Sequence, residues 1–335
     1  MFGFHLLMIF WFAFLFLFLS YVRCDSSSTV IVVTGSSTGI GKAIALDFAK
    51  LGSDYKIYAT MRNPSKADSS LLELNNIEIM EMDVSSDDSV NGAIHSIINR
   101  EGHIDILVNN AGYGLAGSVE TCTIDEAKSL FDINVFGIVR VLQAVLPYMR
   151  KLKNGHIINI SSTSGIRGIA GMDYYTGSKF ALEGITDSLR YTLGPFNIAI
   201  TNINAGPVKT AFMERFGQIH QGGKGTREID DPSGYLHHIT NMAINALAKR
   251  MDSGEAQTPD DVAAVVLNVH RLHLEAKLLE EIPFNVGTSS QSMAILDHIK
   301  KYPTGWGGMY SALLKRMPTI TEVIAINEME KKDEL

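Results

Sequence analysis

Short apolar runs and amphipathic helical patterns alternate along residues 29 to 210 of this 335-residue chain. The first run, residues 29 to 34, is rich in β-branched residues, which favour strands. Comparable runs begin near residues 56, 77, 104, 156 and 198, and helical patterns occupy about 124 to 152 and 173 to 193. Strands that alternate with helices of this length form a parallel sheet covered on both faces. The sequence therefore predicts an α/β fold with one doubly wound parallel sheet.

The composition excludes several classes of protein. Apolar residues make up 46% of the chain and charged residues 19%, so the chain is not disordered. A net charge of -7 gives no reason to expect nucleic-acid binding. Two cysteines are too few for a disulfide scaffold or a four-cysteine zinc site. The ten histidines lack an HExxH or CxxC companion, so no metal site is predicted.

The two ends of the chain resemble targeting signals. Every residue from Leu6 to Leu19 is apolar, which suits a signal-peptide core and is short for a membrane span of about 20 residues. The chain closes in Lys-Asp-Glu-Leu at 332–335, an address read by the KDEL retrieval receptor. We expect a signal peptide over residues 1–24 and retention in the endoplasmic reticulum lumen. Because Arg23 follows the apolar run, a retained anchor that leaves the next domain cytosolic is the alternative.

The expected domain covers residues 25–290, with a substrate loop at about 211–257 and a C-terminal extension over 291–335. Cleavage after Cys24 would leave Cys122 as a lone thiol, which cannot form an intrachain bridge. The sequence Asn159-Ile160-Ser161 is a glycosylation sequon. It ends an apolar strand pattern, so we expect Asn159 to be buried and unmodified.

A glycine cluster follows the first predicted strand and opens a helical pattern. Its spacing is Gly35-x-x-x-Gly39-x-Gly41. Glycines let a backbone approach a pyrophosphate closely, and a helix N-terminus supplies free N–H groups and positive potential. The cluster predicts a dinucleotide site, and an ordinary tight turn is the alternative.

The end of the second strand indicates which dinucleotide binds. Enzymes that use NAD place an acid there for the ribose hydroxyls, whereas this chain has Thr60, followed by Arg62. A guanidinium pairs with a 2′-phosphate that a carboxylate would repel. We therefore predict NADP(H), with Arg62 and Thr38 on the phosphate. The alternative is that Arg62 is simply an exposed loop residue.

Polar residues follow the third and fourth strands at the same expected edge. Asp83 and Val84 end the third, where a carboxylate can accept from the adenine amino group. Asn110, Ala111 and Gly112 follow the fourth, where a cofactor would lie. Asparagines are also common in turns, so this pattern alone does not identify a site.

Three residues with the chemistry of carbonyl reduction follow. Tyr175 and Lys179 lie four apart on a predicted helix and so share a face. A free tyrosine has a pKa of about 10, and a nearby ammonium lowers it. Ser162, at the end of the preceding strand, can hydrogen-bond a substrate oxygen. A carbonyl held by Ser162 and Tyr175 could accept hydride from a nicotinamide, although an incidental YxxxK spacing occurs in many proteins.

These motifs together resemble, in order and spacing, the classical short-chain dehydrogenase/reductase family. The matching strings are Thr34-Gly35-Ser36-Ser37-Thr38-Gly39-Ile40-Gly41, Asn109-Asn110-Ala111-Gly112, Ser162 and Tyr175-Thr176-Gly177-Ser178-Lys179. The resemblance implies a Rossmann-like single domain, usually in a homodimer or homotetramer. It also implies cofactor contacts from Ser37 and Ile40 in the glycine loop.

The resemblance assigns roles by position. Tyr175 matches the general acid/base, Lys179 the residue that lowers its pKa and binds the nicotinamide ribose, and Ser162 the residue that orients the carbonyl. Asn134 matches the asparagine that holds a water for proton relay. Val208 and Thr210 match the segment that contacts the nicotinamide carboxamide, although Ala205 replaces a usual proline just before it.

The strings Ala59-Thr60-Met61-Arg62 and Ser178-Lys179-Phe180-Ala181-Leu182-Glu183-Gly184 look most like the branch of estradiol-type 17β-hydroxysteroid and retinol dehydrogenases. That branch implies an apolar alcohol or carbonyl substrate that is steroid-, retinoid- or lipid-like. The expected function is an NADP(H)-dependent oxidoreductase. The alternative from another class is a non-catalytic NADP-binding regulatory protein of the same fold.

Overall fold

The computed structural model describes residues 28–212, 227, 229–231, 233–254, 256–275 and 285–288. The predicted signal peptide, the C-terminal extension with its KDEL end and the glycine-rich part of the expected substrate loop at 213–226 lie outside the described residues. The expectations about targeting and domain ends therefore stay predictions.

Seven strands form one sheet in the order β3-β2-β1-β4-β5-β6-β7, and every neighbouring pair is parallel. The strands are β1 (Thr29–Val33), β2 (Tyr55–Met61), β3 (Ile77–Glu81), β4 (Ile106–Asn109), β5 (Gly155–Ser162), β6 (Ile198–Ala205) and β7 (Asn285–Gly287). The strand order reverses between β1 and β4, which is the doubly wound arrangement. The predicted fold class is confirmed.

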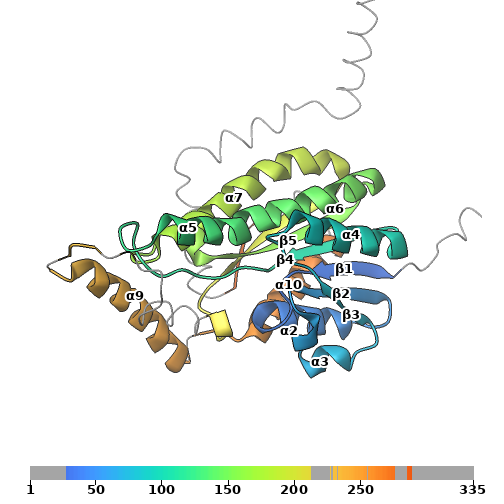
Figure 1. Ribbon diagram of the computed structural model, residues 1–335. Helices are drawn as coiled ribbons and strands as arrows, with labels where there is room; N and C mark the ends of the chain where they lie inside the picture. Colours follow the sequence, from blue (N-terminus) through green and yellow to red (C-terminus); the bar gives the residue numbers. More distant parts are fainter. Residues whose placement is uncertain are drawn as a thin grey trace, which may run out of the picture.

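Helices cover both faces of this sheet (Figure 1). The longer ones are α2 (Gly39–Ala49), α4 (Asp87–Glu101), α5 (Ile124–Phe131), α6 (Ile138–Leu152), α7 (Asp173–Leu193), α9 (Tyr235–Asp252) and α10 (Pro259–Glu275). Shorter turns are η1 (Pro64–Lys66), α3 (Ser69–Leu72), the π-helix η2 (Asp132–Gly137), η3 (Thr163–Gly165) and η4 (Gly194–Phe196). The predicted helix at 173–193 has the bounds of α7.

Two apolar cores lie on opposite faces of the sheet because strand residues alternate between faces. One core joins β-strand residues such as Ile31 and Ile158 to Phe48 of α2 and Val266 of α10. The other joins Val32 and its neighbours to helices α4, α6 and α7. Both clusters consist of nearly unexposed side chains, so each face is sealed by helices as the apolar strand runs require.

The long predicted helix at 124–152 is continuous through α5, η2 and α6. Thr123 and Glu126 form a capping box at its start, which satisfies two backbone donors that the first turn leaves free. Among the described residues this helix is long and apolar enough to cross a membrane. Val141, Leu142 and Val145 are instead buried in the core, so it is a core helix of this fold.

The expected substrate loop contains a helix. Within residues 211–257, α9 packs against the loop before α7, where a Cβ on Gly171 would lie 2.8 Å from Thr240 Cα. Gly171 also has a φ of +75°, so both the close contact and the backbone conformation favour glycine at this position. The strand β7 was not predicted, because a three-residue strand carries too little pattern to read.

Candidate active site

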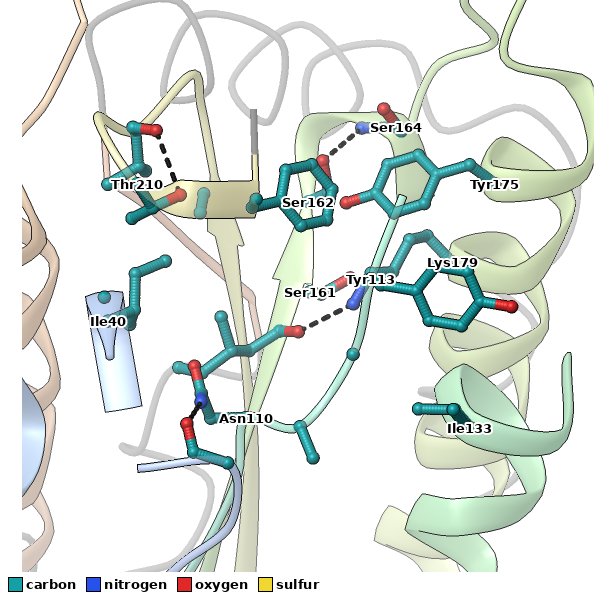
Figure 2. A pocket seen from close by; sticks show the side chains of 18 of the residues that line it. Ile40, Asn110, Tyr113, Ile133, Ser161, Ser162, Ser164, Tyr175, Lys179 and Thr210 are labelled. Atoms are coloured by element: carbon teal, nitrogen blue, oxygen red, sulfur yellow. Dashed lines mark hydrogen bonds between the residues drawn. The ribbon is translucent and has the colours of Figure 1, made fainter. Parts of the chain in front are cut away.

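A cavity of about 580 Å³ opens at the carboxyl ends of the strands. Such a crevice, beside the point where strand order reverses, is where doubly wound folds bind ligands. All predicted site residues except Gly41 and Asn134 line it. They are Gly35, Ser37, Thr38, Gly39, Ile40, Arg62, Asp83, Val84, Asn110, Ala111, Gly112, Ser162, Tyr175, Lys179, Val208 and Thr210. In Figure 2, Ser162, Tyr175 and Lys179 lie on one side of it, with Ile40 and Thr210 across from them.

The glycine positions of the loop leave no room for a side chain. A Cβ on Gly35, which has a φ of +68°, would lie 2.9 Å from Ala111 Cα. A Cβ on Gly41 would lie 2.4 Å from Asn110 Nδ2 and 2.6 Å from the Gly35 carbonyl oxygen. Gly41 is thus required by packing beneath the loop, which explains why it does not line the cavity.

The start of α2 is suited to an anion. Thr38 is its N-cap, but the Thr38 side chain makes no capping hydrogen bond, and the first turn contains no acidic residue. The backbone N–H groups there have no side-chain cap, and a helix N-terminus favours negative charge. The bare glycine loop and this helix end fit the pyrophosphate of a dinucleotide.

Asn110 and Thr34 hold the loop against β4. The Thr34 hydroxyl accepts hydrogen bonds from the backbone N–H groups of Asn110 (2.9 Å) and Ala111 (3.0 Å). The Asn110 amide donates to the carbonyls of Thr34 (2.9 Å) and Gly35 (3.1 Å). Asn110 therefore acts through loop geometry, and the sequence did not single out Thr34, which shares this role.

The nucleotide end carries one cation and one carboxylate. Thr60 is fully buried and its hydroxyl donates to the Val33 carbonyl, whereas Arg62 is exposed at the cavity. Burial raises the pKa of Asp83, but hydrogen bonds from Ser85 and the charge of Arg62 outweigh burial and lower it overall. Asp83 is therefore ionised at neutral pH, and Arg62 presents an exposed cation to the same cavity.

Ser162 and Tyr175 face each other at the other end of the cavity. Ser162 is the last residue of β5, and its hydroxyl accepts from the Ser164 backbone N–H at 3.1 Å. Burial raises the pKa of Tyr175 to about 12, and a hydrogen bond with Ser162 lowers it by a smaller amount. Burial dominates, so Tyr175 is protonated at neutral pH, and the expected effect of Lys179 on its pKa stays a prediction.

Lys179 is buried beside Tyr175. Its Nζ donates to the Ile160 carbonyl at 3.0 Å and lies 5.9 Å from the centre of the Tyr175 ring. Burial lowers the pKa of Lys179 to about 8, and the negative charge of Glu183 opposes that change. The ammonium is thus anchored to the backbone of β5 rather than to the phenol, which is why it does not dominate the pKa of Tyr175.

Asn134 sits in the π-helix η2 and is fully buried. Its Oδ1 accepts from the Tyr113 N–H at 3.0 Å, and its Nδ2 donates to the Tyr113 carbonyl at 2.9 Å and to Ser178 Oγ at 3.2 Å. The side chain therefore clamps the loop after β4 and does not reach the cavity. A water relay at this position would have to use the backbone of the π-turn, a feature frequent at functional sites.

The segment after β6 is held in place despite Ala205. The Gln257 backbone accepts from Lys209 at 2.8 Å and donates to the Pro207 carbonyl at 3.0 Å. These bonds flank Val208, so pairing with Gln257 fixes this turn although Ala205 stands in place of the usual proline. Thr210 lies close to the glycine loop, 3.1 Å from the position of a Cβ on Gly39.

An apolar cluster packs around Tyr175, and its members Met172, Phe212 and Leu247 also line the cavity. It contains Leu115, Ala116, Cys122, Leu130, Met172 and Tyr175, with Phe212, Ile244 and Leu247 packed against it. The Phe212 ring centre lies 5.7 Å from that of Tyr175. Arg167 and Arg250 also line the cavity. Apart from Tyr175, these residues were not predicted as site residues, because they come from separate segments that only the fold brings together.

Residues 29–219, more than half of the chain, match the short chain dehydrogenase family. Human retinol dehydrogenase 8 is 35% identical over 247 residues, which are 71% of this chain and 76% of that protein. Human 17-beta-hydroxysteroid dehydrogenase type 1 is 36% identical over 252 residues, 72% of this chain and 74% of that protein. A 3-ketodihydrosphingosine reductase from Bacteroides thetaiotaomicron is 37% identical over 185 residues, 55% of this chain and 66% of that protein.

Solved structures agree with these sequence matches. A short-chain dehydrogenase from Streptomyces avermitilis has a TM-score of 0.67 and 26% identity, covering 85% of this chain and 98% of its own. The structure of ElxO with NADP bound has a TM-score of 0.61 and 25% identity, covering 80% of this chain and 99% of its own. With the sheet order, the glycine loop and the Ser162–Tyr175–Lys179 geometry, these matches establish that the chain belongs to the short-chain dehydrogenase family of oxidoreductases.

Proposed function

We propose that this oxidoreductase uses NADP(H) to interconvert an apolar alcohol and its carbonyl. The observation that carries the proposal is the position of Ser162, Tyr175 and Lys179, which lie between the nucleotide end of the cavity and the apolar cluster that packs around Tyr175. A substrate oxygen at that point would meet two hydroxyl donors, and the rest of the substrate would lie among apolar side chains. The relatives named for retinol, a steroid and a sphingoid base support a lipid-like substrate.

A nicotinamide dinucleotide, when bound, supplies or accepts the hydride. The Ser162 hydroxyl holds the substrate oxygen by a hydrogen bond. Tyr175, protonated at neutral pH, gives its proton to that oxygen in the reductive direction and takes it back in the oxidative direction. Lys179 faces the cavity beside Tyr175 and would hold the ribose hydroxyls of the nucleotide.

Two features support NADP(H) over NAD(H). Thr60 stands where an acid would bind the ribose 2′-hydroxyl, and its side chain is turned into the fold to bond Val33. Arg62 is exposed at the cavity, where its guanidinium can pair with a 2′-phosphate. The structural relative with NADP bound is in keeping with this choice.

The test is oxidation of NADPH, and separately of NADH, by the purified protein with a ketosteroid, retinal, a long-chain 3-keto lipid and a small polar ketone. We expect faster turnover with NADPH and with the apolar carbonyls. Tight NADPH binding without turnover on any carbonyl would favour the non-catalytic regulatory alternative.

We also propose that the protein forms a homodimer or homotetramer. Ile124 of α5, Phe136 of η2 and Phe180 of α7 are exposed apolar side chains on neighbouring elements. Clustered exposed apolar residues are typical of interfaces. Sedimentation equilibrium should show a dimer or larger, and Phe180→Asp should shift the protein toward monomer; a wild-type monomer at micromolar concentration would contradict this.

A further inference from the structure

Three ionisable side chains form a stripe along α7. Tyr175, Lys179 and Glu183 are spaced by four residues, so they lie on one face of the helix, directed at β5 and β6. The family roles cover the first two and leave Glu183 unassigned. A partly buried carboxylate one turn from an active-site lysine needs a physical explanation, because burying a charge costs free energy unless it is paired.

The Glu183 carboxylate receives three hydrogen bonds from the sheet. Its Oε1 accepts from Ser161 Oγ at 2.5 Å and from Asn204 Nδ2 at 2.7 Å, and its Oε2 accepts from Asn202 Nδ2 at 2.6 Å. An ionised carboxylate accepts hydrogen bonds and donates none. Three donors directed at one carboxyl group therefore favour its charged form.

A row of asparagines extends this arrangement across three strands. Asn109, Asn159 and Asn202 are paired side by side in β4, β5 and β6 and are almost fully buried. The Asn109 amide donates to Asn159 at 2.9 Å, and the Asn159 amide donates to Asn202 at 3.0 Å. Each amide in the row thus donates one hydrogen bond in the direction of Glu183, and Asn202 Nδ2 donates to Thr186 Oγ1 as well, at 2.7 Å.

The backbone of η3 closes over the carboxylate. A Cβ on Gly165 would lie 3.0 Å from Glu183 Cγ and 3.1 Å from Glu183 Oε1. Gly165 is itself buried and follows Ser162 by three residues. Close packing of backbone here limits water, so the attraction between Glu183 and Lys179 is screened less than it would be at a surface.

We propose that Glu183 is a positioning residue of the active site: it is the counter-charge that holds Lys179 as an ammonium next to Tyr175. From β5 and β6 the groups that face Glu183 are the Ser161 hydroxyl and the Asn202 and Asn204 amides, and the charged group that acts on it from α7 is Lys179. Burial raises the pKa of Glu183 overall, and the hydrogen bonds from Ser161, Asn202 and Asn204 and the charge of Lys179 oppose that rise. Burial in turn lowers the pKa of Lys179, and the charge of Glu183 opposes that change. This inference rests on the proposed function, in which Lys179 holds the nucleotide ribose.

The test compares the pH dependence of NADPH affinity in the wild type and in Glu183→Gln. The affinity at each pH is measured by titration, from the change in NADPH fluorescence on binding. In the wild type we expect the affinity to fall as the pH passes about 8, where Lys179 loses its proton. Without the carboxylate charge, that fall should begin about one pH unit lower. The alkaline limb of kcat/KM should move with it on any carbonyl that the protein reduces.

The matched control is Asp187→Asn, which removes an exposed acid one turn further along α7. It should leave both pH profiles in place. If Glu183 were only structural, Glu183→Gln would lower the unfolding temperature and weaken NADPH binding equally at every pH. An unmoved alkaline limb in Glu183→Gln would overturn the proposal.

Ser161→Ala keeps the proposal testable if Glu183→Gln does not fold. It removes one of the three donors, so it should move the alkaline limb in the same direction by a smaller amount, and an unmoved limb would count against the proposal.

Tyr175→Phe separates a failure of the proposed catalytic mechanism from a failure of the role proposed for Glu183. If that variant keeps full turnover, the proposed mechanism fails; if it is inactive and the Glu183→Gln limb is unmoved, only the role of Glu183 fails.

Discussion

The two ends of strand β5 treat their buried polar side chains differently. Towards the carboxyl end, the Asn159 amide accepts a hydrogen bond from Asn109 and donates one to Asn202. At the amino end, His156 Nδ1 has no hydrogen-bond partner among the described residues. The His156 ring stacks against that of His273 of α10, with ring centres 4.5 Å apart, and its Nε2 bonds Thr201 Oγ1 at 3.3 Å. His270, one turn earlier on α10, packs its ring edge-on against Phe48 and has no partner on either nitrogen among the described residues.

The difference shows two ways in which one sheet accommodates buried polar groups. The carboxyl half orders its amides around a charge, and that charge serves the cavity. The amino end keeps its imidazoles neutral: burial lowers the pKa of His156 and of His273, and it lowers the pKa of His270 to about 4. Changes at the carboxyl end should therefore alter chemistry, and changes at the amino end should alter stability in acid.

The largest effect is expected for Tyr175→Phe, which removes the proton donor and keeps the ring. We expect turnover to fall by about 10³-fold, the usual contribution of general acid catalysis. NADPH binding and the unfolding temperature should hardly change, because the ring still packs against Phe212. Steady-state kinetics and fluorescence titration check this, and retention of full activity would refute the assignment.

Arg62→Asp should reverse nucleotide preference. An acid at this point repels a 2′-phosphate and can bind a ribose hydroxyl, so we expect the NADPH/NADH ratio of kcat/KM to fall by about 100-fold. The comparison uses one carbonyl substrate with both nucleotides. Lys66→Asp, an exposed charge reversal beside the same strand that does not line the cavity, is the control and should leave the ratio near the wild-type value.

His270→Leu should stabilise the protein in acid and leave turnover at neutral pH unchanged. His270 has a lowered pKa in the folded state, so the unfolded chain binds more protons as pH falls from about 6.5 to about 4. Stability is therefore lost over that window in the wild type. At pH 5 the lost free energy of unfolding is about 2 kcal/mol, which the variant should recover relative to pH 7.

Denaturant unfolding at pH 5 and pH 7 measures this difference, and any packing change made by leucine cancels between the two conditions. His95→Leu, on the exposed face of α4, is the matched control and should show no such gain. If both variants behave alike, the amino-end cluster does not govern acid stability.

The smallest effect is expected for Thr201→Val, which removes the one hydroxyl that bonds His156. Loss of a single neutral hydrogen bond costs about 1 kcal/mol. Thermal unfolding should show a modest decrease at pH 7, with kcat and KM unchanged. A large loss of turnover would contradict the claim that changes at the amino end of the sheet alter stability and not chemistry.

The elements with strong periodicity were predictable, and the reasons are local. The β-branched run of β1, the full length of α7 and the cap of α10, where Thr258 and Asp261 bond each other, can all be read from neighbouring residues. The glycine loop and the tyrosine–lysine pair were predictable because the fold dictates their spacing.

Other features depend on contacts between distant segments. The amide row requires the register of three strands, and the histidine cluster requires α10 to pack across β5, which no short window of sequence contains. The pKa of Tyr175 could not be predicted because the spacing to Lys179 says nothing about burial. The role of Glu183 had one indication in the sequence: it follows Lys179 by four residues and so lies on the same face of the predicted helix.

The row of amides also acts as a check on strand alignment during folding. Asn109, Asn159 and Asn202 can bond in sequence only when β4, β5 and β6 pair in one register. A slip by one residue would turn an asparagine toward the opposite face, away from its partners. Losing any single asparagine would remove one buried hydrogen bond from each of its neighbours in the row. We therefore expect these three positions to change together, or not at all, in chains that keep this sheet.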